Sequence, residues 1–238
     1  MLERGVLFVP QALDGKSDAP LLVFMHGGNW IPEVAAARTG RAVLHWQANG
    51  GYATPFEQQG AFEKWTDEAA DRAGMKWSRI ELGGWSAGCG GIRQILRHDS
   101  ARQFVARVLM IDGVHAPYTN GKPGPLESEL DTAKLDGIAA FARSAIAGEK
   151  RLLILHTEIF PGTFASTTET ADWLLRELRV PRTAVLKWGP LRTQQLSEAG
   201  AGGFDLLGFA GNSAPDHVDL LHALPAWLLR IDAAPASR

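Results

Sequence analysis

Cysteine is nearly absent from this chain, because Cys89 is the only one among 238 residues. A single thiol cannot form an internal disulfide framework, and it cannot build a cysteine-based zinc cluster. A strong charge of one sign is also lacking, since 24 Lys and Arg stand against 26 Asp and Glu, for a formal net charge of −2. With so balanced a charge, we expect no electrostatic attraction to a polyanion such as nucleic acid. The partner we expect is a small-molecule substrate.

Long hydrophobic runs are missing too. The longest, such as Leu21–Met25 and Leu152–Leu155, are far shorter than the roughly 18 residues that a membrane-spanning helix needs. We therefore expect a soluble protein with no membrane span. The chain opens without a basic segment followed by an apolar stretch, and strand-like sequence begins at Gly5. These features favour a cytoplasmic protein, with a secreted protein that has lost its signal as the alternative.

Hydrophobic residues make up 45% of the chain, which is enough to bury one core and predicts a single domain over residues 1–238. Short apolar runs alternate with longer stretches of helical periodicity, a pattern typical of an α/β fold with a parallel sheet wrapped by helices. The predicted strands are Val6–Val9, Leu21–His26, Ala42–Trp46, Arg79–Gly83, Arg107–Ile111, Leu152–His156, Ala184–Trp188 and Phe204–Phe209. The predicted helices are Ala61–Ala73, Gly91–Arg97, Leu130–Ala147, Thr167–Leu178 and Val218–Leu229.

One shift in composition interrupts this pattern at Thr119–Glu129, where Asn, Gly and Pro cluster. The segment follows one predicted strand and precedes a predicted helix, so we expect a loop rather than a domain linker. Residues 119–150 are a candidate small cap over a site at the sheet edge. An ordinary surface loop is the alternative.

Gly84, Ser86 and Gly88 form the pattern Gly-x-Ser-x-Gly. The pattern follows the predicted strand Arg79–Gly83 and opens the predicted helix Gly91–Arg97. This is the context of a tight strand-to-helix turn that exposes a serine, and glycines let such a turn close without a Cβ clash. The sequence therefore predicts Ser86 as a nucleophile. A glycine-rich turn that serves packing only is the weaker alternative.

A second glycine-rich segment, His26-Gly27-Gly28-Asn29-Trp30, follows another predicted strand. Backbone N–H groups placed after a strand can point into a site at the sheet edge. Together with the N–H of Ala87, those of Gly28 and Asn29 could bind the oxyanion that forms when a serine attacks an acyl carbon. We predict these three amides as an oxyanion hole.

The order strand, His-Gly-Gly-x-Trp, strand, Gly-x-Ser-x-Gly, helix resembles the α/β-hydrolase superfamily, and the resemblance in element order covers nearly the whole chain. The first motif is similar to a variant found in carboxylesterases and arylformamidases. The resemblance implies an α/β-hydrolase fold with a mostly parallel central sheet of about eight strands, flanking helices and a minimal cap. It also implies a serine nucleophile, an acid on a later strand and a histidine near the C-terminus.

The histidines that remain for the base in this order are His115, His156, His217 and His222. We predict His217, because it ends a polar loop between an apolar strand and the amphipathic Val218–Leu229 stretch, where the histidine loop of the superfamily falls. His222 lies inside that stretch, so a packing or surface role is expected for it.

The acid departs from the common pattern of the superfamily. Its usual place, after the strand Leu152–His156, falls on Ile159 or Phe160. Two carboxylates remain, Glu158 at the end of that strand and Asp112 at the end of the preceding one. We favour Asp112, because some members place the acid one strand earlier and because a following glycine puts this short side chain on a sharp turn. Glu158 is the alternative.

Five more residues are predicted to line a substrate pocket: Trp30, Trp85, His115, Tyr118 and His156. The tryptophans flank the predicted oxyanion hole and nucleophile, and the other three lie at the same sheet edge. Core packing and loop support are the alternatives. The spacing of histidines and carboxylates predicts no metal site, and no cofactor is expected. Cys89 is expected to be a small buried hydrophobe.

Together these residues predict a serine hydrolase of carboxylic esters or related acyl compounds, with Ser86 as nucleophile, His217 as base and Asp112 or Glu158 as the orienting acid. Cleavage of amides, by an arylformamidase or peptidase-like activity, is the nearest alternative. A non-catalytic binding protein of the same fold is the alternative from another class. No motif sets the natural substrate, the acyl-chain preference or the oligomeric state.

Overall fold

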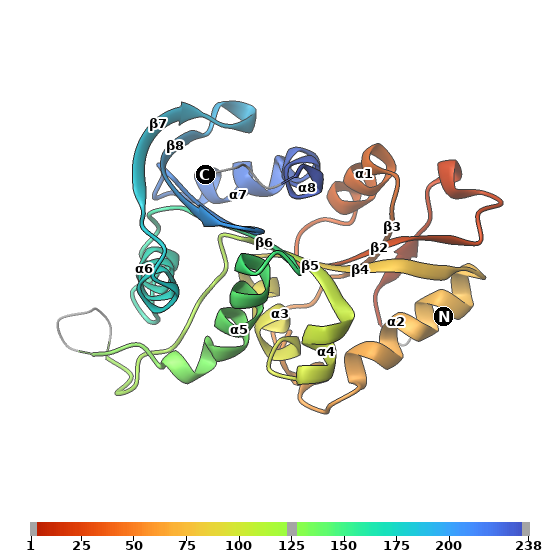
Figure 1. Cartoon of the computed structure of the whole chain (residues 1–238), viewed down its shortest axis with the longest axis horizontal. Coiled ribbons are helices and arrows are strands. Elements are labelled where there is room, and N and C mark those ends of the chain that lie inside the picture. The colour runs from red at the N-terminus through yellow and green to blue at the C-terminus, as the bar shows by residue number, and fades with distance from the viewer. Residues whose placement is uncertain (1–3, 123–127, 235–238) are drawn as a thin grey trace.

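The structure is a computed structural model that describes residues 4–122 and 128–234. Nine strands appear in these residues: β1 (Val6–Phe8), β2 (Asp18–Met25), β3 (Ala42–Trp46), β4 (Lys76–Trp85), β5 (Val105–Ile111), β6 (Arg151–His156), β7 (Thr183–Trp188), β8 (Gln194–Ala201) and β9 (Phe204–Phe209). They form one sheet in the order β1-β3-β2-β4-β5-β6-β9-β8-β7 (Figure 1). The strands from β3 to β9 in this order run parallel, whereas β1, β8 and β7 are antiparallel to their neighbours.

Helices cover both faces of the sheet. They are α1 (Trp30–Thr39), α2 (Ala61–Ala73), α3 (Cys89–Ile95), α4 (Asp99–Phe104), α5 (Asp136–Ile146), α6 (Thr167–Leu178), α7 (Ala214–His222) and α8 (Leu224–Asp232). Helices α1, α7 and α8 lie on one face, and α2, α3, α4 and α5 lie on the other (Figure 1). Helix α6 packs against α5 and β6. The mostly parallel sheet between two helical layers is an α/β fold.

The two faces bury two separate hydrophobic clusters, and β2 contributes to both. Leu21, Val23 and Met25 belong to the cluster on one face, while Leu22 and Phe24 belong to the cluster on the other. All five side chains are fully buried. Because successive side chains of a strand point to opposite faces, a parallel strand covered on both sides must be apolar at every position. This explains the uninterrupted apolar run in the sequence.

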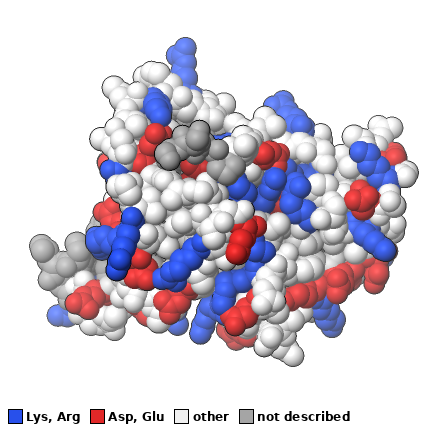
Figure 2. Space-filling model, viewed as in Figure 1, with Lys and Arg blue, Asp and Glu red and all other residues white. Residues whose placement is uncertain are grey.

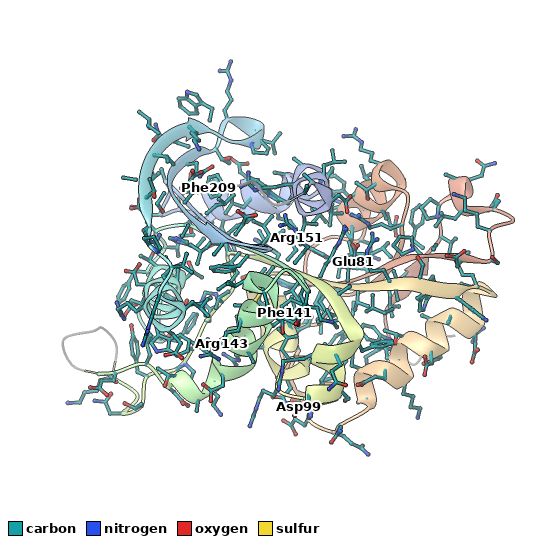
Figure 3. The ribbon with its side chains drawn as sticks, viewed as in Figure 1. Glu81, Asp99, Phe141, Arg143, Arg151 and Phe209 are labelled. Atoms are coloured by element: carbon teal, nitrogen blue, oxygen red, sulfur yellow. The ribbon has the colours of Figure 1, made fainter. Side chains whose placement is uncertain are left out.

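A network of ion pairs joins the C-terminal helix to the sheet. The carboxylate of Glu81 lies 2.6 Å from Nε of Arg79 and 3.3 Å from Nε of Arg41. Arg41 also binds Asp232 of α8 at 2.8 Å. Figure 3 labels Glu81, which lies between the sheet and the helices α1 and α8. Removing one partner of such a buried network would leave an uncompensated charge, so the network fixes how α8 packs.

The strand order reverses between β2 and β4. These strands are neighbours, but the chain leaves β2 toward β3 on one side and leaves β4 toward β5 on the other. Open α/β sheets bind ligands at such a point, where the strand order reverses. The segment that starts at His26 follows β2, and Ser86 follows β4. The two predicted motifs therefore lie at this point of the sheet.

All eight predicted strands are present to within a few residues, but the sheet has a ninth strand, β8, that we did not predict. Its sequence, Gln-Gln-Leu-Ser-Glu-Ala-Gly-Ala, contains no β-branched or aromatic residue, so local propensity gives no strand signal. The strand forms because it pairs antiparallel with β9 on one side and with β7 on the other. Pairing between strands overrides the weak local preference.

The helices differ from the prediction in two places that affect the site. Helix α1 was not predicted, although Pro32 in its first turn and the left-handed Gly40 at its end are typical helix signals. The predicted helix Val218–Leu229 is two helices, α7 and α8, which meet at Ala223 because Pro225 starts the second one. Helix α7 begins at Ala214, so His217 lies in its first turns and not in the preceding loop.

Two shorter differences complete the comparison. The predicted helix Leu130–Ala147 begins with a 3₁₀ turn at Thr132–Lys134 and becomes α-helical only at Asp136, and the short α4 was not predicted. Within the segment 119–150, residues 123–127 lie outside the described residues. Helix α5 packs against β6 and α6, as a crossover between β5 and β6 does. A cap formed by residues 119–150 stays a prediction.

Charges of both signs are interspersed over the face of the molecule shown in Figure 2. This agrees with the near balance of the sequence composition, and the view gives no sign of a surface of one charge. In the described ranges, no helix combines the length and the apolar character that crossing a membrane would require.

Candidate active site

Ser86 stands on a strained turn between β4 and α3. Its φ of 50° lies in the left-handed region, which costs a non-glycine residue on the order of 1 kcal/mol. A 3₁₀ turn, Ser86–Gly88, follows and leads directly into α3. A Cβ at Gly88 would lie 2.1 Å from the carbonyl oxygen of Met25, and one at Gly84 would lie 3.1 Å from the backbone of Gly88. A side chain at Gly88 would therefore collide with the backbone, and one at Gly84 would require its neighbours to shift by a few tenths of an ångström.

Asp112 contacts His217 across the edge of the sheet. Oδ2 of Asp112 lies 2.7 Å from Nδ1 of His217, and the Asp112 side chain is only 2% exposed. Asp112 ends β5 with a φ of 46°, a conformation that aspartate tolerates better than most residues. The next residue, Gly113, passes so close to the serine turn that a Cβ there would lie 2.3 Å from the Ser86 carbonyl oxygen. The turn that carries the carboxylate is thus packed against the turn that carries the serine.

The Asp112 carboxylate accepts three more hydrogen bonds. Oδ1 accepts from the backbone N–H of Thr157 at 2.8 Å and from the hydroxyl of Thr167 at 3.0 Å, and Oδ2 accepts from the hydroxyl of Thr157 at 2.7 Å. Burial by itself raises the pKa of this carboxyl, but the hydrogen bonds from His217 and Thr157 outweigh burial and hold the pKa below its usual value. Asp112 is therefore ionised at neutral pH.

Trp85 and the start of helix α7 hold His217 in place. The indole N–H of Trp85 donates to the His217 carbonyl oxygen at 3.0 Å, and the two rings are 4.5 Å apart between centroids. A capping box of Ser213 and Asp216 starts helix α7 one turn before His217. The Asp216 carboxylate accepts from the hydroxyl and the N–H of Ser213, so it serves the helix end and not the ring of its neighbour.

A pocket of about 160 Å³ brings the serine, the histidine and the carboxylate together. The residues that line it are Ser86, Asp112, His115, Ile159, Pro161, Phe164, Thr167 and His217. No lysine or arginine is among them. Burial lowers the pKa of His115 to about 4, so this ring is neutral at physiological pH. Among the lining residues, Asp112 supplies the one carboxylate.

The predicted oxyanion hole lies at the start of α1. Gly28 and Asn29 are exposed, and Asn29 immediately precedes the helix. Within residues 4–122 and 128–234, neither backbone amide donates a hydrogen bond to another group of the chain. Ala87 lies in the 3₁₀ turn directly after the serine. The three residues follow the carboxyl ends of β2 and β4, but none of them is among the residues that line the pocket with Ser86, and their roles stay predictions.

Glu158, the alternative acid, lies on the surface. Its side chain is exposed, and its backbone N–H donates to the Gly211 carbonyl oxygen at 2.9 Å. The loop that it begins supplies Ile159, Pro161 and Phe164 to the wall of the pocket. The structure brings Asp112, not Glu158, into contact with His217.

The five predicted pocket residues have different places. His115 lines the pocket, and Trp85 packs on His217. Trp30 is 59% exposed at the start of α1, where its ring meets that of His222. His156 is buried away from the pocket, where Nε2 accepts from Arg182 at 3.0 Å. Tyr118 donates to Glu169 at 2.8 Å and lines a separate pocket with it.

Sequence reasoning did not connect Thr157 or Thr167 with Asp112. Both threonines bind the Asp112 carboxylate, although their positions in the sequence form no motif with it. One signal was available, because Ser166 and Glu169 form a capping box that marks the start of α6. A helix that begins at Thr167, just after β6, places the Thr167 hydroxyl at the edge of the sheet.

Cys89 is buried on α3, as expected, and burial raises the pKa of its thiol far above the usual value. Its Sγ donates to the Gly84 carbonyl oxygen at 3.2 Å, so it supports the serine turn. Among the residues that the structure describes, no three or more His, Cys, Asp or Glu side chains gather in a way that could hold a metal ion.

The fold as a whole is similar to solved esterase structures. The native structure of Est2, an esterase of the planctomycete Thermogutta terrifontis, matches with a TM-score of 0.52 and 14% identity, over 97% of this chain and 88% of that one. The propionate-bound form of Est2 matches with a TM-score of 0.54, and the form phosphorylated by paraoxon with 0.51, each at 14% identity over 98% of this chain and 90% of that one. No protein-family model and no curated protein sequence matches this chain. The likeness shows a shared fold.

Gly88 in the serine turn and Gly90 in α3 give a matched test of the close backbone approach. Gly88→Ala should lower the free energy of unfolding by about 2 kcal/mol or more, because the added Cβ meets the Met25 carbonyl oxygen. Gly90→Ala should be neutral or stabilising by up to about 1 kcal/mol, because this position in α3 has no atom within 4 Å of an added Cβ. Denaturant unfolding measures both. Equal stability of the two variants would contradict the close approach.

Proposed function

We propose that this protein is a serine hydrolase of carboxylic esters with an α/β-hydrolase fold, in which Ser86, His217 and Asp112 act as a catalytic triad. The observation that carries the proposal is the 2.7 Å contact between Nδ1 of His217 and the buried carboxylate of Asp112, in a pocket that Ser86 also lines. A buried carboxylate on one ring nitrogen fixes the proton there and leaves the other nitrogen free to act as a base.

The reaction follows from this arrangement. Ser86 Oγ attacks the acyl carbon while Nε2 of His217 takes its proton, and the negative charge on the former carbonyl oxygen is stabilised by the amides of Gly28, Asn29 and Ala87. The tetrahedral intermediate collapses, the C–O bond to the alcohol breaks, and His217 returns the proton to the departing alcohol. Water then attacks the acyl-enzyme in the same way, which releases the acid and restores the serine.

The structural neighbours favour an ester as the substrate. Est2 is an esterase, and solved forms of it are phosphorylated by paraoxon or carry bound propionate or butyrate. The small pocket of this chain supports a similar choice, because 160 Å³ is well below the roughly 300 Å³ at which pockets for drug-sized ligands begin. Its largely apolar wall and the lack of a lysine or arginine favour a short, neutral acyl group.

Replacing the nucleophile tests the function directly. Ser86→Ala should lower the rate of hydrolysis of p-nitrophenyl butyrate by about 10³-fold or more, because only the oxyanion hole and substrate binding remain. A fluorophosphonate probe should label the native protein at Ser86 and leave the variant unlabelled. Circular dichroism checks that the variant is folded. If the folded native protein neither hydrolyses esters nor reacts with the probe, a non-catalytic binding protein becomes the better interpretation.

The two carboxylates allow the acid to be assigned by a matched pair. Asp112→Asn should lower kcat by about 10⁴-fold, because an amide at this position favours the wrong tautomer of His217. Glu158→Gln should change kcat less than about threefold, because the Glu158 side chain is exposed and does not contact the His217 ring. Steady-state kinetics with p-nitrophenyl butyrate measures both. A severe loss in the glutamine variant and a mild one in the asparagine variant would assign the acid to Glu158.

The pocket volume predicts a preference for short acyl chains. Along a series of p-nitrophenyl esters, kcat/KM should be highest for acetate to butyrate and at least about 10-fold lower for octanoate. The reason is that one methylene too many for an apolar pocket weakens binding of the transition state by roughly 1–3 kcal/mol. Ile159→Ala removes part of the wall and should move the optimum to longer chains. Equal kcat/KM values from acetate to octanoate would show that the acyl chain does not occupy this pocket.

A further inference from the structure

The Asp112 carboxylate has more hydrogen bonds than are needed to orient one imidazole. Thr157 supplies two of them, from its backbone N–H to Oδ1 and from its hydroxyl to Oδ2. We propose that Thr157 is a positioning residue that sets the pH range of the reaction, because its hydroxyl shares the same carboxylate oxygen with His217. The inference rests on the proposed function, since it concerns the acid of the same triad.

The geometry gives the Thr157 hydroxyl a defined role. Its Oγ1 is 2.7 Å from Oδ2 of Asp112, the same distance as Nδ1 of His217. An ionised carboxylate can only accept, so the threonine hydroxyl donates. The side chain is fully buried and does not line the pocket, so it does not meet the substrate. Its effect on the reaction must pass through the carboxylate.

Thr157 is itself held in place by the start of α6. The Thr157 carbonyl oxygen accepts from the Thr168 hydroxyl at 3.0 Å, and it lies 3.1 Å from Nδ1 of His156. The Thr167 hydroxyl donates to the other carboxylate oxygen, Oδ1, at 3.0 Å. Hydrogen bonds from the end of β6 and the start of α6 therefore hold the carboxylate on one side, and His217 contacts it on the other.

The sign of the effect follows from electrostatics. A proton on His217 is stabilised by the negative charge on Oδ2, and a donor on the same oxygen withdraws part of that charge. With the Thr157 hydroxyl present, the imidazolium is stabilised less, so the ring stays neutral down to a lower pH. Because the base must be neutral to accept the serine proton, the hydroxyl extends activity toward acid pH.

Other titratable groups lie near the pair. His26, Cys89, His115 and His156 interact electrostatically with Asp112 or His217, and Asp216 precedes His217 in α7. Burial lowers the pKa of each of these three histidines and raises that of the thiol, so all four are neutral near pH 7. A rate profile sums the effects of all these groups, so the protonation of the His217 ring itself also has to be followed.

The test compares three threonine variants. Thr157→Val removes the donor and should move the acid limb of kcat/KM to higher pH by about 0.5 unit or more, and lower kcat several-fold with little change in KM. Thr157→Ser keeps the hydroxyl and should restore the native profile. Thr170→Val is the matched control, because this buried hydroxyl on α6 donates to the Val114 carbonyl oxygen at 2.5 Å and does not contact the carboxylate. It should lose stability without moving the pH profile.

A second readout keeps the test independent of turnover. The pH midpoint at which the His217 ring takes up a proton, followed by NMR, should move upward in Thr157→Val and stay unchanged in Thr170→Val. Identical midpoints in the native protein and Thr157→Val, or a shift of equal size in Thr170→Val, would overturn the proposal. If the His217 midpoint moves in Thr157→Val but the native protein hydrolyses no ester, the proposed function is refuted and the role of Thr157 in the pair is supported.

Discussion

The carboxylate of Asp112 is the point on which the site depends. Four hydrogen bonds reach it, from the backbone and hydroxyl of Thr157, the hydroxyl of Thr167 and the ring of His217. They join β5, the end of β6, the start of α6 and the first turns of α7. A buried carboxylate without such partners would be costly, and with them it is both ionised and fixed in direction. One side chain thus joins four parts of the chain that are far apart in sequence.

Close backbone approach sets the other side of the site. The serine turn, the carboxylate turn and the end of β2 meet at Gly88 and Gly113, where any side chain would collide with a carbonyl oxygen. Ser86 and Asp112 both adopt left-handed backbone conformations there. Strain of this kind persists only where the surrounding structure fixes it, and here the buried strands β4 and β5 do so.

The position of the carboxylate that contacts His217 also affects the pocket. This carboxylate, Asp112, follows β5, and the loop after β6 supplies Ile159, Pro161 and Phe164 to the wall beside the serine. The superfamily resemblance places the acid at Ile159 or Phe160, and both of these residues are apolar in this chain. The loop after β6 therefore gives the pocket a largely apolar wall.

The sequence by itself determined the α/β class and most of the strands, because buried parallel strands must be apolar throughout, as Leu21–Met25 shows. It also singled out Ser86 and His217, because a strand-to-helix turn with flanking glycines and a histidine after the last strand are local signals. It could not find β8, whose sequence has no strand preference and which forms only by pairing with its neighbours.

Only the tertiary structure shows which of the two carboxylates, Asp112 or Glu158, contacts His217, because this contact joins residues that are 105 positions apart in the sequence. The threonines that hold Asp112 stayed hidden for the same reason, since contacts between β5, β6 and α6 leave no periodic pattern in the chain.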